Sequence, residues 1–452
     1  MIRAPGGAII CLKRRHPVAS VQHSLFSWQE VEASSDIQRL AAVLDTLEDD
    51  PLIAVLTQER KQRRDDYPIV AVWNSIIAAF LFNLPGPAAL IRELRRNAEL
   101  RQVCGFDPVL GDKAVPPAWV YSRFFRKLDA HQSLVTAIFH RLLEHLRAYL
   151  PELGRHVAVD SKALPARHAK EKDADIGTKT EKLPDGEERV TFSWFGYKLH
   201  LLIDSTHEIP LAFEVTAASA SDSPRLLPLV GQLERQHPEV LAQTYDLSAD
   251  LAYDDGADKQ LLYEAYEIHP VIPSRALGKE KMKPLDPRHH DTIYVSRDGQ
   301  VCCKVRPFDP DPNAAYCPME YQGFEKDRGT LKFRCPAAAF GVECRNQAAC
   351  RSQTKDQGFG RVLRIGFHHD PRLYTSRYQH SRAFKTLYKA RTSIERFFYR
   401  LDHFYGFEHP QWGGLKRVTT RVTLALTAVL ATALAWCEAK QHQKIRSKFQ
   451  AA

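Results

Sequence analysis

Hydrophobic positions recur at helical spacing through the first third of the chain. Apolar residues follow this period through Ile69–Leu81 and again through Leu134–Leu150, and Ala88–Leu100 has the pattern of one amphipathic helix with a basic face. The Pro-rich stretch Val115–Ala118 interrupts the pattern and separates two helical blocks. The pattern predicts a helical region over residues 36–150, which would suit either a DNA-binding domain or a helical dimerisation module.

After Arg155 the period changes to the alternation typical of strands. Two helical stretches, over residues 223–233 and 255–266, interrupt the later strands. Strands that first form a meander and then alternate with helices predict a mixed α/β sheet. The predicted strands cover residues 156–162, 196–204, 209–216, 245–250 and 269–272.

The last third combines an irregular stretch with further helices. Residues 276–367 are rich in Gly, Pro, Asp and Cys and predict an inserted, mainly β segment. Helices are expected over residues 378–405 and 424–436, before a basic tail over 440–448. The predicted domains are therefore an N-terminal helical domain (1–150), a core in two parts (151–275 and 368–452) and the insertion between them (276–367).

Two apolar runs, residues 69–84 and 422–437, are shorter than the roughly 20 residues that cross a bilayer. We expect both to be buried core helices, and a soluble, cytoplasmic protein with no membrane partner. The chain has 452 residues, of which 44% are hydrophobic, and this excludes a disordered protein and a disulfide-stabilised miniprotein.

The basic residues are concentrated in one part of the chain. The net charge is +9, and residues 351–400, with 12 Lys and Arg against 3 Asp and Glu, carry a balance of +9 by themselves. Such a stretch is either the solvated face of a helix or a surface that holds phosphates. Aromatic residues are interspersed with the basic ones there, which also suits nucleic acid.

Six of the nine cysteines lie between Cys302 and Cys350. In an intracellular protein this clustering favours a metal site or a structural role over disulfides. A structural zinc site is one interpretation, and buried reduced thiols are the other. The zinc ligands would be Cys317, Cys335, Cys344 and Cys350.

Three acidic residues are placed where they could converge. Asp160 and Asp250 lie at or just past the ends of two predicted strands, and Glu395 lies in a basic helix. Three carboxylates on one edge of a sheet suit a pair of Mg²⁺ or Mn²⁺ ions and attack at phosphorus. Each residue also has a structural interpretation, as a turn residue, a helix cap or, for Glu395, a partner of an arginine one turn away. By position alone Asp204 and Asp246 compete with them.

At these residues the chain resembles the DDE transposases of bacterial insertion sequences, which have a ribonuclease-H-like core. The strands Val157-Ala-Val-Asp160 and Trp194–Asp204 resemble the start of that core, and Ser248-Ala-Asp250-Leu-Ala-Tyr-Asp resembles its second-aspartate motif. Arg391-Thr-Ser-Ile-Glu395-Arg-Phe-Phe resembles its glutamate helix. The 144 residues between Asp250 and Glu395 are similar to the subgroup with a β-rich insertion before that helix.

The resemblance implies roles for individual residues. Asp160, Asp250 and Glu395 would be catalytic and would hold two Mg²⁺ or Mn²⁺ ions. Tyr388 and Arg391, from the family's Tyr-x₂-Arg-x₃-Glu-x₆-Lys pattern, would contact DNA. Asp402 stands where that pattern has Lys, and Arg400 is the replacement cation that we expect. The other residues expected to bind DNA are Lys198 and Arg396, with Arg92, Arg95 and Arg96 as candidates for reading bases.

The resemblance also implies an activity and partners. The protein would bind terminal inverted repeats as a homodimer, cleave double-stranded DNA hydrolytically and join the freed 3′-hydroxyl to target DNA. No small-molecule substrate is expected. A nuclease that does not join strands and a non-catalytic DNA-binding protein derived from a transposase are the alternatives.

Overall fold

The chain forms two compact units. The computed structural model describes residues 35–60, 67–182, 188–278, 281–285, 293–304, 316–341, 360–407 and 412–447. Unit 1 comprises residues 1–150, 164–197 and 398–452, and unit 2 comprises residues 151–163 and 198–397.

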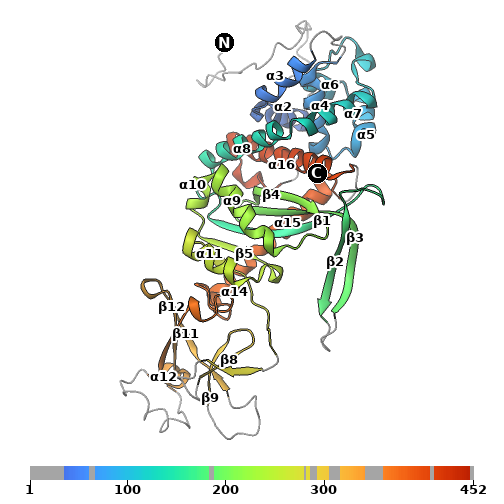
Figure 1. Ribbon diagram of the computed structural model, residues 1–452. Helices are drawn as coiled ribbons and strands as arrows, with labels where there is room; N and C mark the ends of the chain where they lie inside the picture. The colour runs from blue at the N-terminus through green and yellow to red at the C-terminus, as the bar shows by residue number, and fades with distance from the viewer. Residues whose placement is uncertain are drawn as a thin grey trace, which may run out of the picture. The chain divides into compact units, whose positions relative to one another are not determined.

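Unit 1 consists mainly of helices, which confirms the predicted helical region over residues 36–150 (Figure 1). Its elements are α2 (Ser35–Thr46), α3 (Asp50–Glu59), α4 (Ile69–Leu81), α5 (Gly86–Arg96), α6 (Ala98–Cys104), the 3₁₀ helix η1 (Gly111–Ala114), α7 (Ala118–Ala130), α8 (Gln132–Tyr149), α16 (Leu415–Glu438) and the 3₁₀ helix η8 (His442–Lys444).

Helix α16 is the centre of unit 1. It packs against α2, α4, α7 and α8, and nearly all of its residues from Val418 to Leu434 are buried. By length and composition α16 could span a membrane, but 89% of its most apolar window is buried inside the fold, as in a core helix. The predicted helix, residues 424–436, was too short because charged and Thr residues, including Arg417 and Arg421, replace the apolar run over the first turns of α16 without ending the helix.

The single helix predicted over Ala88–Leu100 is wrong. The structure ends α5 at Arg96 and starts α6 at Ala98, with Asn97 extended between them. The Asn97 side chain accepts a hydrogen bond from the Leu100 amide (3.0 Å) and so caps α6. A short polar side chain that caps a new helix therefore outweighs the continuing amphipathic pattern.

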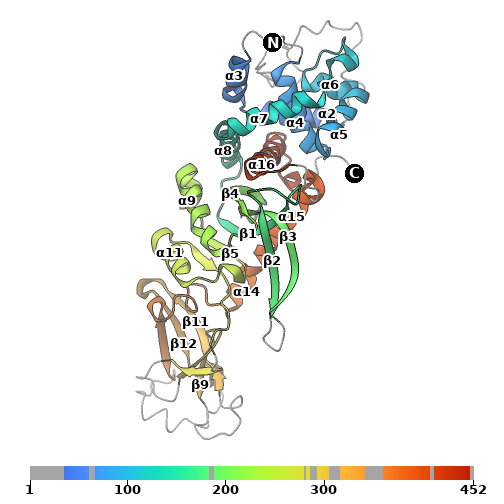
Figure 2. The same ribbon diagram turned by 45° about the vertical axis from the view of Figure 1, so that its right-hand side comes forward.

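The sequence analysis also missed a long hairpin in unit 1. Strand β2 (Asp175–Lys182) pairs antiparallel with the first part of β3 (Glu188–Asp204), and Figure 2 shows the two as a long ribbon. Gly177 lies beneath the Trp194 ring, which leaves no room for a side chain at position 177. The missing side chain lets a large ring cover the partner strand.

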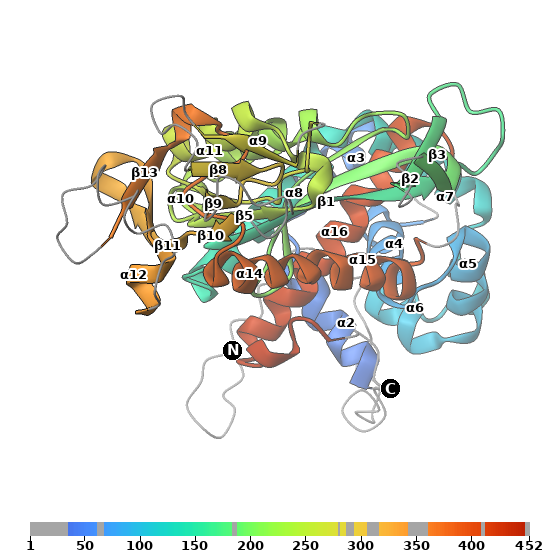
Figure 3. The same ribbon diagram turned by 90° about the horizontal axis from the view of Figure 1, so that it is seen from below.

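Unit 2 contains the predicted mixed α/β sheet. Its strands, in the order β4–β3–β1–β5–β6, include two parallel pairs, β1 with β5 and β5 with β6. In the view of Figure 3, α9 and α11 lie on one side of the sheet and α14 on the other. These elements are β1 (His156–Pro165), β4 (Ile209–Ala217), η2 (Ser223–Arg225), α9 (Leu226–Gln236), α10 (Pro238–Ala242), β5 (Asp246–Ala249), η3 (Leu251–Tyr253), α11 (Gly256–Tyr266), β6 (His269–Val271), α14 (Arg382–Tyr388), η7 (Lys389–Arg391) and α15 (Thr392–Tyr405).

The predicted insertion is mainly β, as expected. It contains two antiparallel sheets, in the orders β10–β9–β8–β7 and β11–β12–β13. The elements are β7 (Met282–Pro284), β8 (Ile293–Ser296), β9 (Val301–Lys304), β10 (Tyr316–Pro318), β11 (Glu320–Glu325), η5 (Lys326–Arg328), β12 (Thr330–Arg334), α12 (Pro336–Phe340), β13 (Val362–Gly366) and η6 (Phe367–His369).

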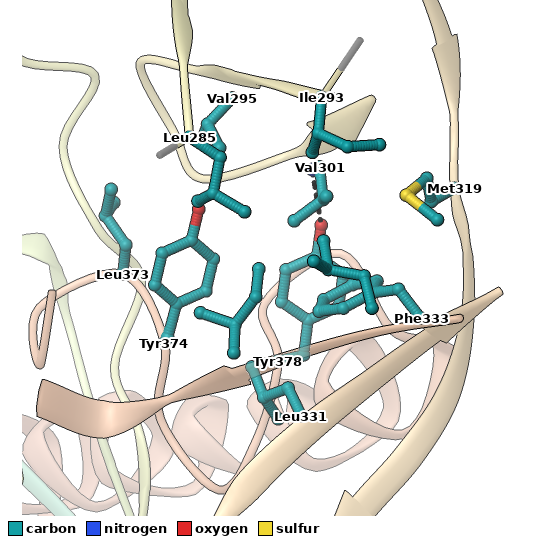
Figure 4. Packing of buried hydrophobic residues seen from close by; sticks show 12 residues of the cluster. Leu285, Ile293, Val295, Val301, Met319, Leu331, Phe333, Leu373, Tyr374 and Tyr378 are labelled. Carbon is teal, nitrogen blue, oxygen red and sulfur yellow. Dashed lines mark hydrogen bonds between the residues drawn. The ribbon is translucent and has the colours of Figure 1, made fainter. Parts of the chain in front are cut away.

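The core of the insertion includes residues that follow it in sequence. Leu373, Tyr374 and Tyr378, from the segment that leads into α14, pack among the buried side chains of both sheets (Figure 4). The Tyr378 hydroxyl accepts a hydrogen bond from the Val301 amide (3.3 Å) and donates one to the Gly299 carbonyl (3.2 Å). The insertion is therefore packed directly onto the segment that enters the glutamate helix region.

Candidate functional site

Asp160 and Asp250 lie side by side on the sheet. The parallel strands β1 and β5 pair with Val159 opposite Ala249, so the next residue on each strand is an aspartate. Adjacent strands lie about 4.8 Å apart, which brings the two carboxylates to one place. The prediction that both end a strand was wrong for Asp160: β1 continues to Pro165, and Asp160 stands where β1 extends beyond the shorter β5.

Asp250 is fixed by the turn that follows it. Its backbone is extended, and its Oδ1 accepts a hydrogen bond from the Ala252 amide (2.8 Å), which caps the 3₁₀ helix η3. Asp160 Oδ1 accepts a hydrogen bond from the Ser161 amide (2.7 Å). Both carboxylates are half-buried, so they are held in place while part of each stays accessible.

Arg391 forms ion pairs with both Asp160 and Glu395, and so connects Glu395 to the two aspartates. One guanidinium nitrogen lies 3.2 Å from Asp160 Oδ2, and the other lies 2.6 Å from Glu395 Oε1. Glu395 is one helical turn after Arg391, and its side chain is 52% exposed. The one-turn ion pair that the sequence analysis gave as a structural role for Glu395 is thus present, and the same arginine also reaches Asp160.

Two tyrosines border the carboxylates. Burial raises the pKa of Tyr388, and the charges of Asp250 and Asp160 raise it further against the opposing effect of Arg391. Burial also raises the pKa of Tyr253 well above its ordinary value, and nearby carboxylates, including Asp160 and Asp250, add to this. The Tyr253 hydroxyl has no hydrogen-bond partner among the described residues. Both phenols therefore stay protonated and are available as donors.

A fourth carboxylate, Asp222, lies in the same neighbourhood. It also raises the pKa of Tyr253, and its Oδ1 accepts a hydrogen bond from Lys198 Nζ (3.1 Å), which donates to the Ala220 carbonyl as well (2.8 Å). The buried His200 lies 3.6 Å from the same oxygen, and burial lowers its pKa to about 4. The sequence analysis gave Asp222 no role.

The remaining predicted DNA contacts are less closely connected to the aspartates. Arg396 donates to Glu208, which is 3% exposed, at 2.7 Å, so this arginine is engaged in a partly buried ion pair. Arg400 and Asp402 lie later in α15, in the part of the helix that belongs to unit 1. Their roles stay predictions.

The two competing aspartates have structural partners instead. Asp204 is fully buried and accepts hydrogen bonds from the amides of Gly154 (2.9 Å) and His207 (2.6 Å). Asp246 begins β5, at the opposite end of that strand from Asp250, and its Oδ2 lies 2.8 Å from His156 Nδ1. Neither is placed to share a ligand with Asp160 and Asp250.

A buried ion network is centred on Asp254, in the loop that follows Asp250. Lys259 Nζ donates to Asp254 Oδ1 (2.7 Å), to Ser274 Oγ (2.9 Å) and to the Arg372 carbonyl (3.0 Å), and the Lys259 side chain is 0% exposed. Asp254 Oδ2 also accepts from Arg372 (3.1 Å) and from the Arg275 amide (2.7 Å). Arg275 precedes the insertion and Arg372 follows it. The network therefore ties both ends of the insertion to the loop after Asp250.

The described cysteines of the insertion are divided between its two sheets. Cys317 on β10 pairs across the strands with Cys303 on β9, whereas Cys335 follows β12. Cys344 and Cys350 lie outside the described residues. Within the described ranges no three His, Cys, Asp or Glu side chains are grouped as metal ligands, which leaves the zinc site a prediction.

The same result bears on the carboxylates, since Asp160, Asp250 and Glu395 are not a closed ligand set as they stand. The donor types nevertheless fit a divalent ion: all three are carboxylates, two share one sheet position, and Glu395 is exposed enough to turn. Arg391 already supplies positive charge to Asp160 and Glu395, and a metal ion would compete with it there.

Comparison with known proteins agrees with this arrangement. The family model described as "Transposase DDE domain" matches residues 151–431, which contain all three carboxylates. The chain belongs to the DDE transposase family. The predicted family is thereby confirmed, and the mixed sheet of unit 2 confirms the predicted α/β class.

As a DDE transposase the chain is a DNA transposase, a metal-dependent enzyme that transfers phosphoryl groups on DNA. Members of the family use divalent ions, generally Mg²⁺ or Mn²⁺. No curated protein matches the chain. A solved structure, the cryo-EM structure of a piggyBac transposase synaptic complex with hairpin DNA, is similar at 9% identity and a TM-score of 0.38, and the match covers 92% of this chain and 80% of that one.

Proposed function

We propose that this transposase mobilises an insertion sequence, and that Asp160, Asp250 and Glu395 are its catalytic residues. It binds the element's terminal inverted repeats, hydrolyses the strands there to free 3′-hydroxyls, and joins those hydroxyls to target DNA. The observation that carries the proposal is the register of β1 and β5, which places Asp160 beside Asp250 while Arg391 connects Asp160 to Glu395.

The three carboxylates would hold two Mg²⁺ or Mn²⁺ ions. When bound, such a pair activates the attacking oxygen and stabilises the leaving one. The side chains have separate tasks: Asp160 and Asp250 are held by backbone amides, and Glu395, now paired with Arg391, would complete the ligand set. Arg391 is then free to contact a phosphate of the substrate.

Two of the other predicted contacts, Tyr388 and Lys198, are connected to this centre. Tyr388 borders both aspartates, and as a protonated phenol it is a donor for a phosphate oxygen. Lys198 approaches from the neighbouring strand β3 and is joined to Asp222. We assign Arg396 and Arg400 to the DNA backbone farther along the glutamate helix.

Three further assignments complete the proposal. Two ends must be brought together for transposition, so a homodimer is expected in the DNA complex, and the cytoplasm is the expected compartment. The insertion would hold a structural zinc ion through Cys317, Cys335, Cys344 and Cys350. Metal analysis of the purified chain beside its Cys335→Ser variant tests that ion, and equal zinc contents would refute the role of Cys335.

The test of the catalytic assignment is cleavage and joining of DNA that carries the element's own ends. Asp160→Asn, Asp250→Asn and Glu395→Gln should each lower the rate of Mg²⁺-dependent cleavage by at least about a thousandfold. Each replaces a negatively charged carboxylate ligand with a neutral amide, which binds the metal ions more weakly. Binding of the end DNA should persist in all three variants. Glu264→Gln, an exposed carboxylate on α11, is the matched control and should cleave normally.

The possible outcomes separate the alternatives. Substantial cleavage by any of the three variants would remove that residue from the active site. Ends that are cleaved but never joined would indicate a nuclease. Binding of the ends by the wild type without any cleavage in Mg²⁺ or Mn²⁺ would indicate a non-catalytic DNA-binding protein.

A further inference from the structure

Helix α7 in unit 1 carries a polar stripe on the face opposite its core contacts. Tyr121, Phe124 and Leu128 are buried against the other helices, among which α7 contacts α5, α8 and α16. Trp119, Ser122, Arg123 and Arg126 are exposed and follow helical spacing, so they line one face over two turns.

This stripe has positive charge that the described part of the chain leaves uncompensated. The helix has one acidic residue, Asp129, which is turned inward and held by Arg417 (2.9 Å) and Thr420 (2.8 Å). None of the described carboxylates lies within ion-pair distance of Arg123 or Arg126.

The two arginines contrast with Lys127 on the same helix. Lys127 lies outside the stripe and is paired with Glu59 at 2.8 Å. Arg123 is instead stacked against Trp119, with its guanidinium carbon 5.0 Å from the ring centre, and the indole is 58% exposed. The ring holds the guanidinium without neutralising it, so the charge stays available for a partner.

We propose that α7 enters the major groove of the terminal repeat and that its stripe reads the base pairs there. An α-helix fits the major groove, and arginine is the side chain that binds guanine through two parallel hydrogen bonds. Helices of this kind use mainly the residues of their N-terminal half, where Trp119, Ser122 and Arg123 lie, and Arg126 follows on the same face less than one turn later. The inference rests on the proposed binding of the element's ends.

The same charges argue against a second copy of the chain as the occupant. A two-fold symmetric dimer would set the stripe against itself and bring Arg123 and Arg126 toward their own copies. Unpaired like charges at an interface are unfavourable, whereas DNA phosphates neutralise them and release counterions.

Helix α5 provides the contrast that the test needs. It packs on α7 and exposes Arg92 and Arg95, the residues that the basic pattern of the sequence suggested as base readers. Arg96 is engaged by Glu93 at 2.6 Å. We assign Arg92 and Arg95 to phosphates, which carry no sequence information.

The experiment measures binding of the full chain to two labelled duplexes by fluorescence anisotropy at several salt concentrations. One duplex carries the inverted repeat that borders the chain's own coding sequence, and the other has the same bases scrambled. Arg123→Ala and Arg126→Ala should each weaken binding to the repeat by roughly tenfold to a hundredfold and weaken binding to the scrambled duplex much less.

Two further variants separate base reading from charge. Arg123→Lys keeps the charge but loses the paired hydrogen bonds, so it should bind the scrambled duplex normally and the repeat poorly. Arg95→Ala should weaken binding to both duplexes alike and reduce the salt dependence by about one phosphate contact. Arg147→Ala, an exposed arginine on α8, is the control for loss of one charge.

If the double variant Arg123→Ala/Arg126→Ala still binds the repeat selectively, the proposal for α7 is overturned and the proposed function is left standing. The same follows if α7 variants change the sedimentation behaviour of the free chain but not its DNA selectivity. A wild type that does not distinguish the repeat from the scrambled duplex would instead contradict the proposed function itself.

Discussion

The buried pair of Lys259 and Asp254 should be among the most sensitive positions in unit 2. Both side chains are almost fully enclosed, at 0% and 1% exposure, and their atoms are 2.7 Å apart. Burial by itself would raise the pKa of Asp254, but the charge of Lys259 and the bonds from Lys259, the Arg275 amide and Arg372 outweigh it and lower that pKa. The carboxylate therefore stays charged and depends on its cations.

Removing one partner leaves the other charged and buried, which costs roughly 3–5 kcal/mol of unfolding free energy. Lys259→Met keeps the length of the side chain and should cost about 3 kcal/mol, the low end, because Arg372 still holds Asp254. Asp254→Asn should cost about 5 kcal/mol, since it leaves two cations without a carboxylate. The double variant should cost at least about 2 kcal/mol less than the sum of the single ones.

The positions of the tryptophans make the assay specific. The five tryptophans that the structure describes, at positions 73, 119, 194, 412 and 436, belong to unit 1, and unit 2 has no tryptophan in its sequence. Tryptophan fluorescence in urea therefore follows unit 1, whereas amide hydrogen exchange in residues 246–275 follows the network directly. We expect the Lys259→Met variant to exchange faster in these residues.

Lys326→Met is the matched control, because Lys326 forms an exposed pair with Glu267 at 3.3 Å. Exposed pairs contribute little, so exchange in residues 246–275 should not change. A Lys259→Met variant that loses less than about 1 kcal/mol, or single-variant effects that simply add, would refute the account of a coupled buried network.

Two other predictions concern pH and metal. Burial lowers the pKa of His200 to about 4. Between about pH 6.5 and 4 the unfolded chain therefore binds a proton at His200 that the folded chain does not bind. The free energy of unfolding should fall over this range, by up to about 1.4 kcal/mol for each pH unit of acidification. Because His200 belongs to unit 2, urea unfolding is followed here by far-ultraviolet circular dichroism. The His200→Gln variant should flatten this part of the stability profile, and parallel profiles for variant and wild type would contradict the assignment. In the absence of DNA, the Arg391→Ala variant should bind Mn²⁺ about tenfold more tightly than the wild type, because the guanidinium competes with the ion for Glu395. The factor corresponds to the shift of about one unit that a neighbouring arginine causes in the pKa of a carboxyl group. In an electron paramagnetic resonance titration beside Arg396→Ala as control, unchanged or weaker Mn²⁺ binding by Arg391→Ala would show that no such competition exists.

Local sequence patterns were sufficient for most elements of the core. Periodicity correctly placed the β-branched strand before Asp160, the strands on either side of the turn at residues 205–208 and the helix of Glu395. Each of these elements has one buried face, so the period of its apolar residues can be recognised from its own segment alone. Periodicity failed where a single polar residue competes with it. Asn97 ends one helix and caps the next, and the spacing of apolar residues cannot predict that hydrogen bond.

The sequence by itself determined the family and the class of fold, and it predicted which three carboxylates are catalytic, since these follow from residue types in a fixed order. Tertiary structure decided what those residues contact. The pairing of Val159 with Ala249 brings together aspartates that are 90 positions apart, and Arg391 links one of them to Glu395. Similarly, only packing shows that Lys259 is enclosed by both ends of the insertion and that Asp129 is turned inward, which leaves the outer face of α7 positively charged. Contacts between segments distant in sequence depend on strand register and burial, and neither is encoded in any one segment.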